Sequence, residues 1–356
     1  MAWNESGSNV DIAISTRVRI ARNVRGKAFP NRGNEATLQS VAVSVRDALL
    51  EGGSALAPHF RYIGIKDVDL MDREFLMEKH LISPALAMKN SAAGVIIDEK
   101  DELSIMLNEE DHIRIQCIKK GFRLEDAYDM ANKADDLIEE RIDYAFDDRY
   151  GYLTACPTNL GTGIRMSVML HLPALTVTGG IDGVVKMAGK YGLTIRGIYG
   201  EGTEAMGEMY QISNQNSLGL TEMEILKNVK SVTKGVIKQE RELRGKLLDR
   251  DEVSVRDRIM RAYGTLRYCV RISVKEAMQL ISTMRLGIDM GIIEDVDIET
   301  ASALMDSIQP AVLCKNTNSE LNDSMLDVKR AGYIKKEIDS ARMRIREGGD
   351  ENGNIW

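Results

Sequence analysis

The sequence predicts an α+β protein built in two parts, a domain that mixes strands and helices followed by a domain of helices alone. Over roughly the first 220 residues, segments in which apolar residues alternate in steps of two are interleaved with helical segments. Beyond Thr221 the apolar residues recur almost entirely at helical spacing. We therefore expect a first domain at residues 11–240 and an all-helical domain at residues 250–356.

The composition is that of a globular protein with enough apolar residues for a sizeable core. The chain has 356 residues, of which 44% are hydrophobic and 28% charged. Its formal charge of −7 offers no general attraction for nucleic acid, so any anion must be bound by arginines gathered locally. The apolar stretches are far shorter than the roughly 20 residues of a membrane-spanning helix. Neither nucleic acid nor a membrane is expected as a partner.

The cysteines and the first residues indicate a protein of the reducing cytoplasm. The chain has four cysteines, which are scattered and form no CxxC pair. The first ten residues, MAWNESGSNV, lack the charged and then apolar pattern of a signal peptide. A cytoplasmic location is the expectation.

The junction between the two domains is predicted to contain a long helix and a charged linker. Thr221 and Glu224 have the spacing of a capping box, which marks the start of a helix. An apolar stripe at helical spacing follows at Leu226, Val229, Val232 and Val236. The charged stretch 249–252 is the expected linker, and the stretch 273–276 opens another helix beyond it.

Four strand-like segments, at 11–20, 112–118, 164–172 and 193–200, place arginine opposite an apolar face. Because side chains alternate along a strand, Ile12, Ile14, Thr16, Val18 and Ile20 share one face of the first segment and its arginines share the other. The same alternation holds in the other three segments. The arginines selected in this way are Arg17, Arg19, Arg114, Arg165 and Arg196.

Arginine opposite a buried face is usually just the solvated side of an antiparallel sheet. Here the alternating positions hold arginine repeatedly and no lysine, and guanidinium groups gathered on one sheet repel each other unless an anion lies among them. The planar guanidinium suits phosphate oxygens. The pattern therefore indicates a nucleoside triphosphate with Mg²⁺. No Walker A motif occurs, and the GTG at 161–163 lacks the spacing of a dinucleotide fingerprint.

The stretch LNEEDHIRIQ, residues 107–116, crowds Glu109, Glu110 and Asp111 where a hairpin turn is expected. With STRVRIARN (15–23), CPTNLGTGIR (156–165) and RGIYGEGTEAMGEMYQISN (196–214), it resembles the phosphagen kinase family, the ATP:guanidino phosphotransferases. The resemblance covers roughly residues 11–240 and implies an antiparallel sheet flanked by helices. The small helical domain that precedes the sheet in kinases of free arginine or creatine is expected to be absent. A C-terminal helical domain and the motif EKHLISPAL (78–86) are similar to the bacterial protein-arginine kinases.

The resemblance implies roles for individual residues. Glu110 matches the carboxylate that contacts the acceptor guanidinium, Glu201 matches its partner, and Glu109 matches a supporting or metal-side acid. Cys156 matches a reactive cysteine beside the acceptor, and His80 matches a histidine that packs against adenine. The five arginines would bind the triphosphate, and the remaining nucleotide contacts would come from Ser15, Thr16, Val18, Met166, Ser167, Val168, Met169, Gly197, Ile198, Tyr199, Gly200 and Glu201. ATP and Mg²⁺ are the implied cofactors, with no metal cage made by the protein alone.

Two departures from the family pattern stand out. Met166 occupies a position that is commonly alanine, and alternation places it on the apolar face, so we expect repacking and no lost activity. In the element that binds phosphoarginine in these kinases, Asp327 and Arg330 are kept, but Leu326 replaces the leading arginine. This replacement puts phosphoarginine binding in doubt. Four other residues are expected to be structural: His112, His171, Met206 and Met209.

The resemblance implies a protein-arginine kinase that transfers the γ-phosphoryl group of MgATP to arginine side chains, in a stress response that marks proteins for degradation. One alternative is a kinase of free arginine or another small guanidino compound. Another is a non-catalytic adaptor that keeps the fold, although the retained acids and arginines argue against it. The implied partners are proteins with accessible arginines, an activator protein and a protease–chaperone, and the implied assembly is a homodimer.

Overall fold

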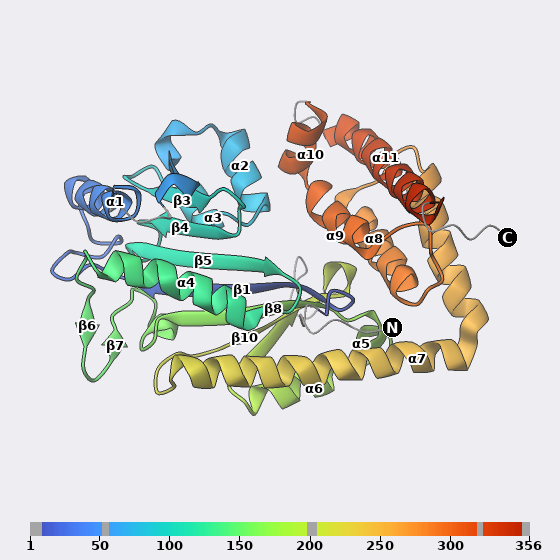
Figure 1. Ribbon diagram of the computed structural model, residues 1–356, viewed down its shortest axis with the longest axis horizontal. Coiled ribbons are helices and arrows are strands. Elements are labelled where there is room, and N and C mark those ends of the chain that lie inside the picture. Colours follow the sequence, from blue (N-terminus) through green and yellow to red (C-terminus); the bar gives the residue numbers. More distant parts are fainter. Residues whose placement is uncertain (1–8, 52–56, 198–204, 319–322, 351–356) are drawn as a thin grey trace.

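The computed structural model describes residues 9–51, 57–197, 205–318 and 323–350, which form a sheet domain and a helical domain joined by one long helix (Figure 1). The described strands make an eight-stranded antiparallel sheet in the order β2-β3-β4-β5-β1-β8-β10-β9. The strands are β1 (Ala13–Arg22), β2 (Phe60–Gly64), β3 (Gly94–Asp98), β4 (Leu103–Leu107), β5 (Ile113–Lys120), β8 (Ile164–His171), β9 (Leu193–Gly197) and β10 (Met209–Asn214). A small separate ribbon pairs β6 (Phe146–Asp147) with β7 (Gly151–Tyr152).

The helices divide between the two domains. The sheet domain contains α1 (Glu35–Leu50), α2 (Leu70–Glu78), α3 (Pro84–Ala87), α4 (Leu124–Glu139), α5 (Pro173–Val177) and α6 (Ile181–Gly189). The connecting helix is α7 (Glu222–Tyr268), and the helical domain adds α8 (Val274–Asp289), α9 (Ile298–Ser307), α10 (Pro310–Thr317) and α11 (Asp323–Asp350). None of the helices in the described ranges combines the length and the apolar character of a membrane span.

The two faces of the sheet have different coverings. Helices α1, α4 and the first part of α7 pack on one face, where Val18, Ile115 and Val168 are completely buried in the largest core. The opposite face carries the arginines, and over β3 and β4 it is covered by α2 and α3. The antiparallel sheet flanked by helices that the sequence predicts is confirmed. Its core side fixes the strands, so the polar side can hold charges in fixed positions.

Helix α7 begins where the sequence predicts but continues through the predicted linker. The capping box is present, with Thr221 accepting from the Glu224 N–H and Glu224 bonded to the Thr221 backbone. The prediction of a linker at 249–252 is wrong, because the helix bends there without ending. Only Asp251 leaves helical geometry (φ −157°, ψ 75°), and its Oδ1 accepts from the Ser254 N–H at 3.1 Å, so that it caps the helix beyond the bend.

One predicted strand face is also interrupted. The pairing of β1 with β8 shifts register between Ala13 and Ser15, so the alternation predicted for Ile12 through Ile20 does not hold at its beginning. As a result Ile14 packs against the core of the helical domain, whereas Ile12 and Ala13 are buried in the sheet core. The bulge thus gives the helical domain an apolar contact on the sheet.

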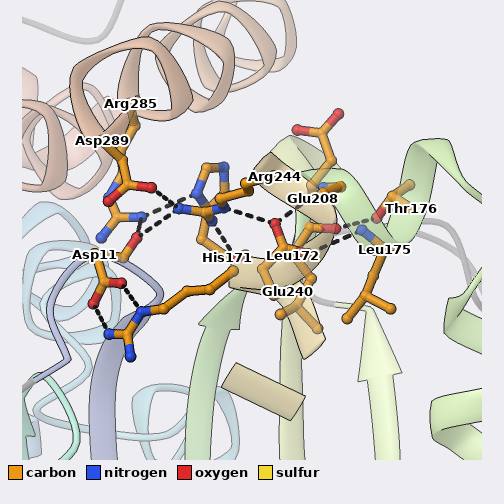
Figure 2. Close-up of polar contacts among 12 residues, drawn as sticks. Asp11, His171, Leu172, Leu175, Thr176, Glu208, Glu240, Arg244, Arg285 and Asp289 are labelled. Atoms are coloured by element: carbon orange, nitrogen blue, oxygen red, sulfur yellow. Dashed lines mark hydrogen bonds and ion pairs between the residues drawn. The ribbon is translucent and has the colours of Figure 1, made fainter. Parts of the chain in front are cut away.

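A buried polar network joins the two domains (Figure 2). The completely buried carboxylate of Glu240 accepts from the N–H groups of Ala174 at 3.0 Å and Leu175 at 2.9 Å, at the start of α5. Arg244 bonds Glu240 at 2.8 Å and extends to Asp289 of α8 at 2.6 Å. Each buried charge therefore has a partner of opposite sign or a backbone dipole.

His171 and Arg285 continue this network. Arg285 Nη1 donates to His171 Nδ1 at 3.0 Å and to the carbonyl of Asp11 at 2.9 Å. His171 Nε2 lies 2.8 Å from the Ser282 hydroxyl. Burial first, and then the nearby arginines, hold the pKa of His171 well below its ordinary value, so the ring is neutral. These contacts agree with the structural role expected for His171, as does the packing of Met206 and Met209 against the helical core.

Replacing Arg244 by methionine should lower the free energy of unfolding by about 3–5 kcal/mol, because it leaves the buried Glu240 carboxylate without its counter-ion. Chemical denaturation followed by circular dichroism measures the change. The matched control is Arg261→Met, which removes an arginine of the same helix whose ion pair with Asp257 is exposed to solvent, and which should leave stability nearly unchanged. Equal losses in both variants would contradict the proposed importance of the buried network.

Candidate functional site

The antiparallel register brings the predicted arginines onto one continuous face. Arg19 lies directly opposite Arg165 across the β1–β8 pair, and Arg17 lies opposite Ser167. Arg114 reaches the same face from β5, where it pairs with Ala21. Arg196 lies opposite Gln211 at the β9 edge and is exposed. The structure therefore confirms the alternation argument, with four neighbouring guanidinium groups and a fifth on β9, two strands beyond the strand of Arg165.

The guanidinium groups are held together against their mutual repulsion. Burial first, and then Arg17, Arg114 and Arg165, lower the pKa of Arg19 well below its ordinary value, and the one acid that opposes this shift is Glu109. The Nε–H groups of Arg19 and Arg165 are buried and have no hydrogen-bond partner among the residues that the structure describes. Buried donors without acceptors are uncommon and costly. Charge and geometry thus fit a bound polyanion, whose oxygens would accept from these donors.

Three acids in the β4–β5 hairpin have three different environments. The hairpin is anchored by Asn108, which adopts a left-handed conformation (φ 56°) and donates to the carbonyls of Leu38 at 2.8 Å and Ala92 at 2.6 Å. Asp111 is buried and accepts from Asn23 Nδ2 and from the Ala155 N–H, both at 2.6 Å. This aspartate therefore ties the hairpin to β1 and to the segment that leads to Cys156.

Glu109 is a buried counter-ion. Arg114 Nη1 lies 2.6 Å from each of its carboxylate oxygens, and the hydroxyl of Ser83 also donates to it. Burial alone would raise the pKa of Glu109, but Arg114, Ser83 and the Glu110 N–H together lower it below the ordinary value. The glutamate is therefore ionised and fixed, and it supports the arginine face.

Glu110 is the exposed acid of the three. Burial first, and then the charges of Asp111 and Glu109, raise its pKa above the ordinary value for a carboxylate, against the lowering effects of Arg114 and a hydrogen bond with Cys156. A carboxylate that is exposed and disfavoured as an anion readily accepts a cation or a proton. It is the group of this hairpin best placed to react with a ligand.

Glu110 and Cys156 open into the same cavity as the arginines. This cavity, of about 140 Å³, is lined by Arg19, Glu109, Glu110, Arg114, Cys156 and Arg165. Cys156 Sγ lies 3.1 Å from the Thr158 hydroxyl in the 3₁₀ turn Pro157–Asn159. The structure thus brings an exposed acid and a thiol beside the arginines that are suited to phosphate.

The GTG at 161–163 has a packing role. Gly163 adopts φ 68°, and a Cβ at this position would lie 2.6 Å from the carbonyl of Ala21. Gly161, at φ 109°, would place a Cβ 2.7 Å from the carbonyl of Ser217. Only glycine fits such close backbone approaches. The motif lets the loop that carries Cys156 lie against β1.

A second cavity, of about 340 Å³, continues from the arginine face towards His80. His80 has a left-handed backbone (φ 59°), and its carbonyl accepts from Gln116 Nε2 at 2.6 Å. Its pKa is lowered, by burial first and then by Arg17, although Asp306 of the helical domain opposes the shift. His80 and the arginines therefore share one elongated hollow.

Several predicted nucleotide contacts do not face this hollow. Thr16, Val18, Met166 and Val168 are completely buried on the other side of the sheet, so their side chains do not line the hollow, and a nucleotide contact by these residues stays a prediction. Their alternation with the arginines explains why a contiguous motif contains them. Ser15, Ser167 and Met169 do lie on the arginine side of the register. Gly197 ends β9, and the remaining predictions, Ile198, Tyr199, Gly200 and Glu201, fall outside the described residues.

The two residues proposed to bind phosphoarginine are engaged within the helical domain. Arg330 is 2% exposed and donates to the carbonyls of Ile308 at 3.0 Å and Ile272 at 2.9 Å. Its Nη1 also bonds Asp327 at 2.5 Å. Leu326, the departure noted in the sequence, is buried in a small core with Leu313. In this arrangement Arg330 of α11 connects that helix to the segments at Ile308 and Ile272. Phosphoarginine binding stays a prediction.

Sequence reasoning assigned no role to several residues that build the site. Asp111 and Asn23 anchor the acidic hairpin, Ser83 holds Glu109, and Gln116 orients the His80 segment. Asp111 stands within the acidic stretch and Ser83 within EKHLISPAL, so both were visible as part of a motif. Their partners are distant in the chain, and no local pattern identifies them.

The chain is similar to known kinases in both of its parts. The model of the ATP:guanido phosphotransferase C-terminal catalytic domain matches residues 41–243, and that of the protein-arginine kinase McsB C-terminal domain matches residues 252–348. The chain is 47% identical over 332 residues to a protein-arginine kinase of Halothermothrix orenii, and the aligned region covers 93% of this chain and 94% of that protein. The chain is also 41% identical over 338 residues to a protein-arginine kinase of Bacillus subtilis, and the aligned region covers 95% of this chain and 93% of that protein.

Solved structures of small-molecule guanidino kinases share the fold. Lombricine kinase superposes with a TM-score of 0.60 at 26% identity, over 67% of this chain and 68% of that chain. A duplicated taurocyamine kinase from Schistosoma mansoni, with bound transition-state analog components, superposes with a TM-score of 0.59 at 27% identity. That match covers 67% of this chain and 34% of the duplicated chain.

Replacing Arg19 by methionine should have opposite effects with and without a polyanion. In the ligand-free protein the melting temperature is expected to rise, because a buried and mutually repelled charge is removed. Tripolyphosphate at a hundred times its Kd should stabilise the unchanged protein by about 2.7 kcal/mol and the variant far less at the same concentration. Differential scanning calorimetry measures both effects.

The control for this experiment is Arg61→Met, which removes an exposed arginine of the distant strand β2 that is paired with Asp101. It should leave stabilisation by tripolyphosphate unchanged. If Arg19→Met were stabilised by the anion as strongly as the unchanged protein, the arginine face would not be the anion site.

Proposed function

Because the chain belongs to the ATP:guanido phosphotransferase family, and within it to the protein-arginine kinases, we propose that it transfers the γ-phosphoryl group of ATP to arginine side chains of proteins. One observation carries the proposal. An anion-binding arginine face and an exposed carboxylate with a raised pKa, Glu110, line one cavity. Phosphoryl transfer needs little more from a protein than positioning and charge stabilisation.

The arginines are proposed to bind the triphosphate. Arg17, Arg19, Arg114 and Arg165 can each donate charge-assisted hydrogen bonds worth roughly 1.5–3 kcal/mol apiece. Because they stand on a rigid sheet, they need no rearrangement when charge develops on the transferred group. The buried donors of Arg19 and Arg165 would gain acceptors only when the nucleotide is bound.

Glu110 is proposed to bind the acceptor guanidinium and to take its proton. A guanidinium has a pKa near 13, so removing its proton at pH 7 before the reaction would cost roughly 8 kcal/mol. In the proposed step the arginine nitrogen forms a bond to the γ-phosphorus while the bond to the β–γ bridging oxygen breaks, and the proton passes to Glu110 as the nitrogen loses basicity. Cys156 lies beside Glu110 and would help to orient the guanidinium.

The nucleotide is proposed to bind as its Mg²⁺ complex. Magnesium keeps several water ligands and commonly needs only one or two carboxylates besides phosphate oxygens. No group of three potential ligands lies together among the residues that the structure describes, and the Glu109 oxygens are engaged by Arg114 and Ser83. This donor set fits an ion held mainly by the nucleotide. When bound, the ion would neutralise part of the phosphate charge.

The setting of the activity is part of the proposal. All four cysteines are free thiols, which supports action in the reducing cytoplasm. A stress response that marks proteins for degradation, an activator protein, a protease–chaperone partner and a homodimer stay predictions.

Replacing Glu110 by glutamine should reduce phosphoryl transfer to a protein substrate by at least about a hundredfold, because the amide cannot accept the proton or pair with the guanidinium. Nucleotide affinity should change little, since Glu110 lies on the acceptor side of the cavity. Transfer is measured with radiolabelled ATP, and affinity by calorimetry. The matched control is Glu102→Gln, whose glutamate pairs with Lys119 away from the cavity. Full activity of Glu110→Gln would exclude the proposed role.

The acceptor is tested by competition between free arginine and an unfolded, casein-like protein. We expect phosphoarginine within the protein even when free arginine is supplied in large excess, because the free amino acid brings two further charged groups that gain little from this cavity. Mass spectrometry under conditions that spare the acid-labile P–N bond identifies the product. Efficient formation of free phosphoarginine, with the protein unlabelled, would instead identify a small-molecule kinase.

A further inference from the structure

The helical domain contributes a side chain to the nucleotide cavity. Among the residues that line the 340 Å³ hollow, Gln309 comes from the junction of α9 and α10, whereas Arg17, His80 and the others come from the sheet domain. We propose that Gln309 recognises the base of the nucleotide by accepting a hydrogen bond from the exocyclic amino group of adenine. The inference rests on the proposed function for the identity of the ligand as a nucleotide.

Gln309 is fixed in place by contacts across the domain boundary. It is the N-cap residue of α10, and the carboxylate of Glu78, from α2, accepts from the Val312 N–H at 2.9 Å and also from the Ala311 N–H. Burial raises the pKa of Glu78, whereas these two N–H groups favour its ionised form. A carboxylate at a helix N-terminus is a favourable pairing. Figure 1 shows α10 beside α2.

Further contacts between α2 and α10 make this junction firm. Lys315 of α10 forms an ion pair with Asp72 and lies 4.5 Å from the centre of the Phe75 ring. Met71 packs against the small core that contains Leu313. Gln309 is therefore a fixed part of the cavity wall.

The hydrogen bonds of Gln309 determine which end of its amide is available. Its Nε2 donates to the carbonyl of Met305 at 3.0 Å. A carbonyl oxygen accepts only, so the nitrogen of the amide must be the atom on that side. The Oε1 atom accepts no hydrogen bond from the described residues. Gln309 thus offers a ligand an acceptor.

The lining of the hollow distinguishes a phosphate end from a base end. Arg17, Arg19 and Arg114 lie at one end, on the sheet. The remaining lining consists of His80, Gln309 and an apolar group formed by Met77, Ile82 and Pro84, with three polar residues, Glu78, Ser83 and Gln116, that are hydrogen-bonded to other groups of the protein. An apolar wall with a few polar groups suits an aromatic base whose orientation must be fixed. Adenine presents an N–H donor at position 6, whereas hypoxanthine presents a carbonyl oxygen, which would face Oε1 unfavourably.

The test compares, by calorimetry, how the full chain binds ATP and ITP, whose base has a carbonyl group at position 6 in place of the amino group and a proton on the adjacent N1. The unchanged protein should bind ATP at least about fivefold more tightly than ITP, the discrimination expected from one hydrogen bond. In Gln309→Leu, which is similar in size but has no acceptor, the ratio should fall to within about twofold of unity. Asn316→Leu removes an exposed amide of the same helix and should keep the original ratio.

The ratio of the two nucleotides within each variant cancels any general loss of folded protein. A second variant, Gln309→Ala, should give the same reduced ratio. An unchanged ratio in both Gln309 variants, or no preference for ATP in the unchanged protein, would overturn the inference. Failure of the proposed function would look different: nucleotides would bind with the expected preference, but no phosphoryl group would reach a protein substrate.

Discussion

Repulsion among guanidinium groups held on one rigid surface is the constraint on which the rest of the structure depends. Arg19 is surrounded by Arg17, Arg114 and Arg165, and side chains on a loop would move apart. Here the strands cannot separate, because their other face is buried beneath α1, α4 and α7. The core on one side of the sheet thereby maintains an unfavourable concentration of charge on the other. A polyanion is the ligand that relieves it.

The acidic hairpin shows how neighbouring residues of one chemical type acquire separate roles. Glu109 faces the arginines and forms an ion pair with Arg114. Asp111 points inward, where it accepts hydrogen bonds from Asn23 and from the Ala155 N–H. Both charges disfavour ionisation of Glu110, the exposed acid between them. The pKa of one carboxylate is thus raised by two others that are bonded to the protein itself, which explains why the chain places three acids in a single turn.

Local periodicity predicted much of this protein. Alternation identified the arginine face, and the capping box located the start of α7, since both patterns depend on nearest neighbours along the chain. Periodicity failed at the bulge beside Ala13 and at residue 251, where the helix bends but does not end. It also could not identify contacts such as Glu240 with α5 or Glu78 with α10, which depend on how distant elements pack. The outline of the site was therefore predictable, and its supports were not.

Helix α7 belongs to both domains at once. Its buried residues end at Arg244 on the sheet side and resume at Ile259 on the helical side, and no residue of the stretch 245–258 is buried. Each residue of a helix adds about 1.5 Å of length and about 100° of rotation. Together with the bend at Asp251, the length of this stretch therefore sets how the helical domain is rotated relative to the sheet. Apart from Asp251, which caps the helix, and Val255, which packs against the helical core, its side chains make few buried contacts, but the loss or gain of a single residue would turn the helical domain, and Gln309 with it, away from the cavity that Gln309 lines.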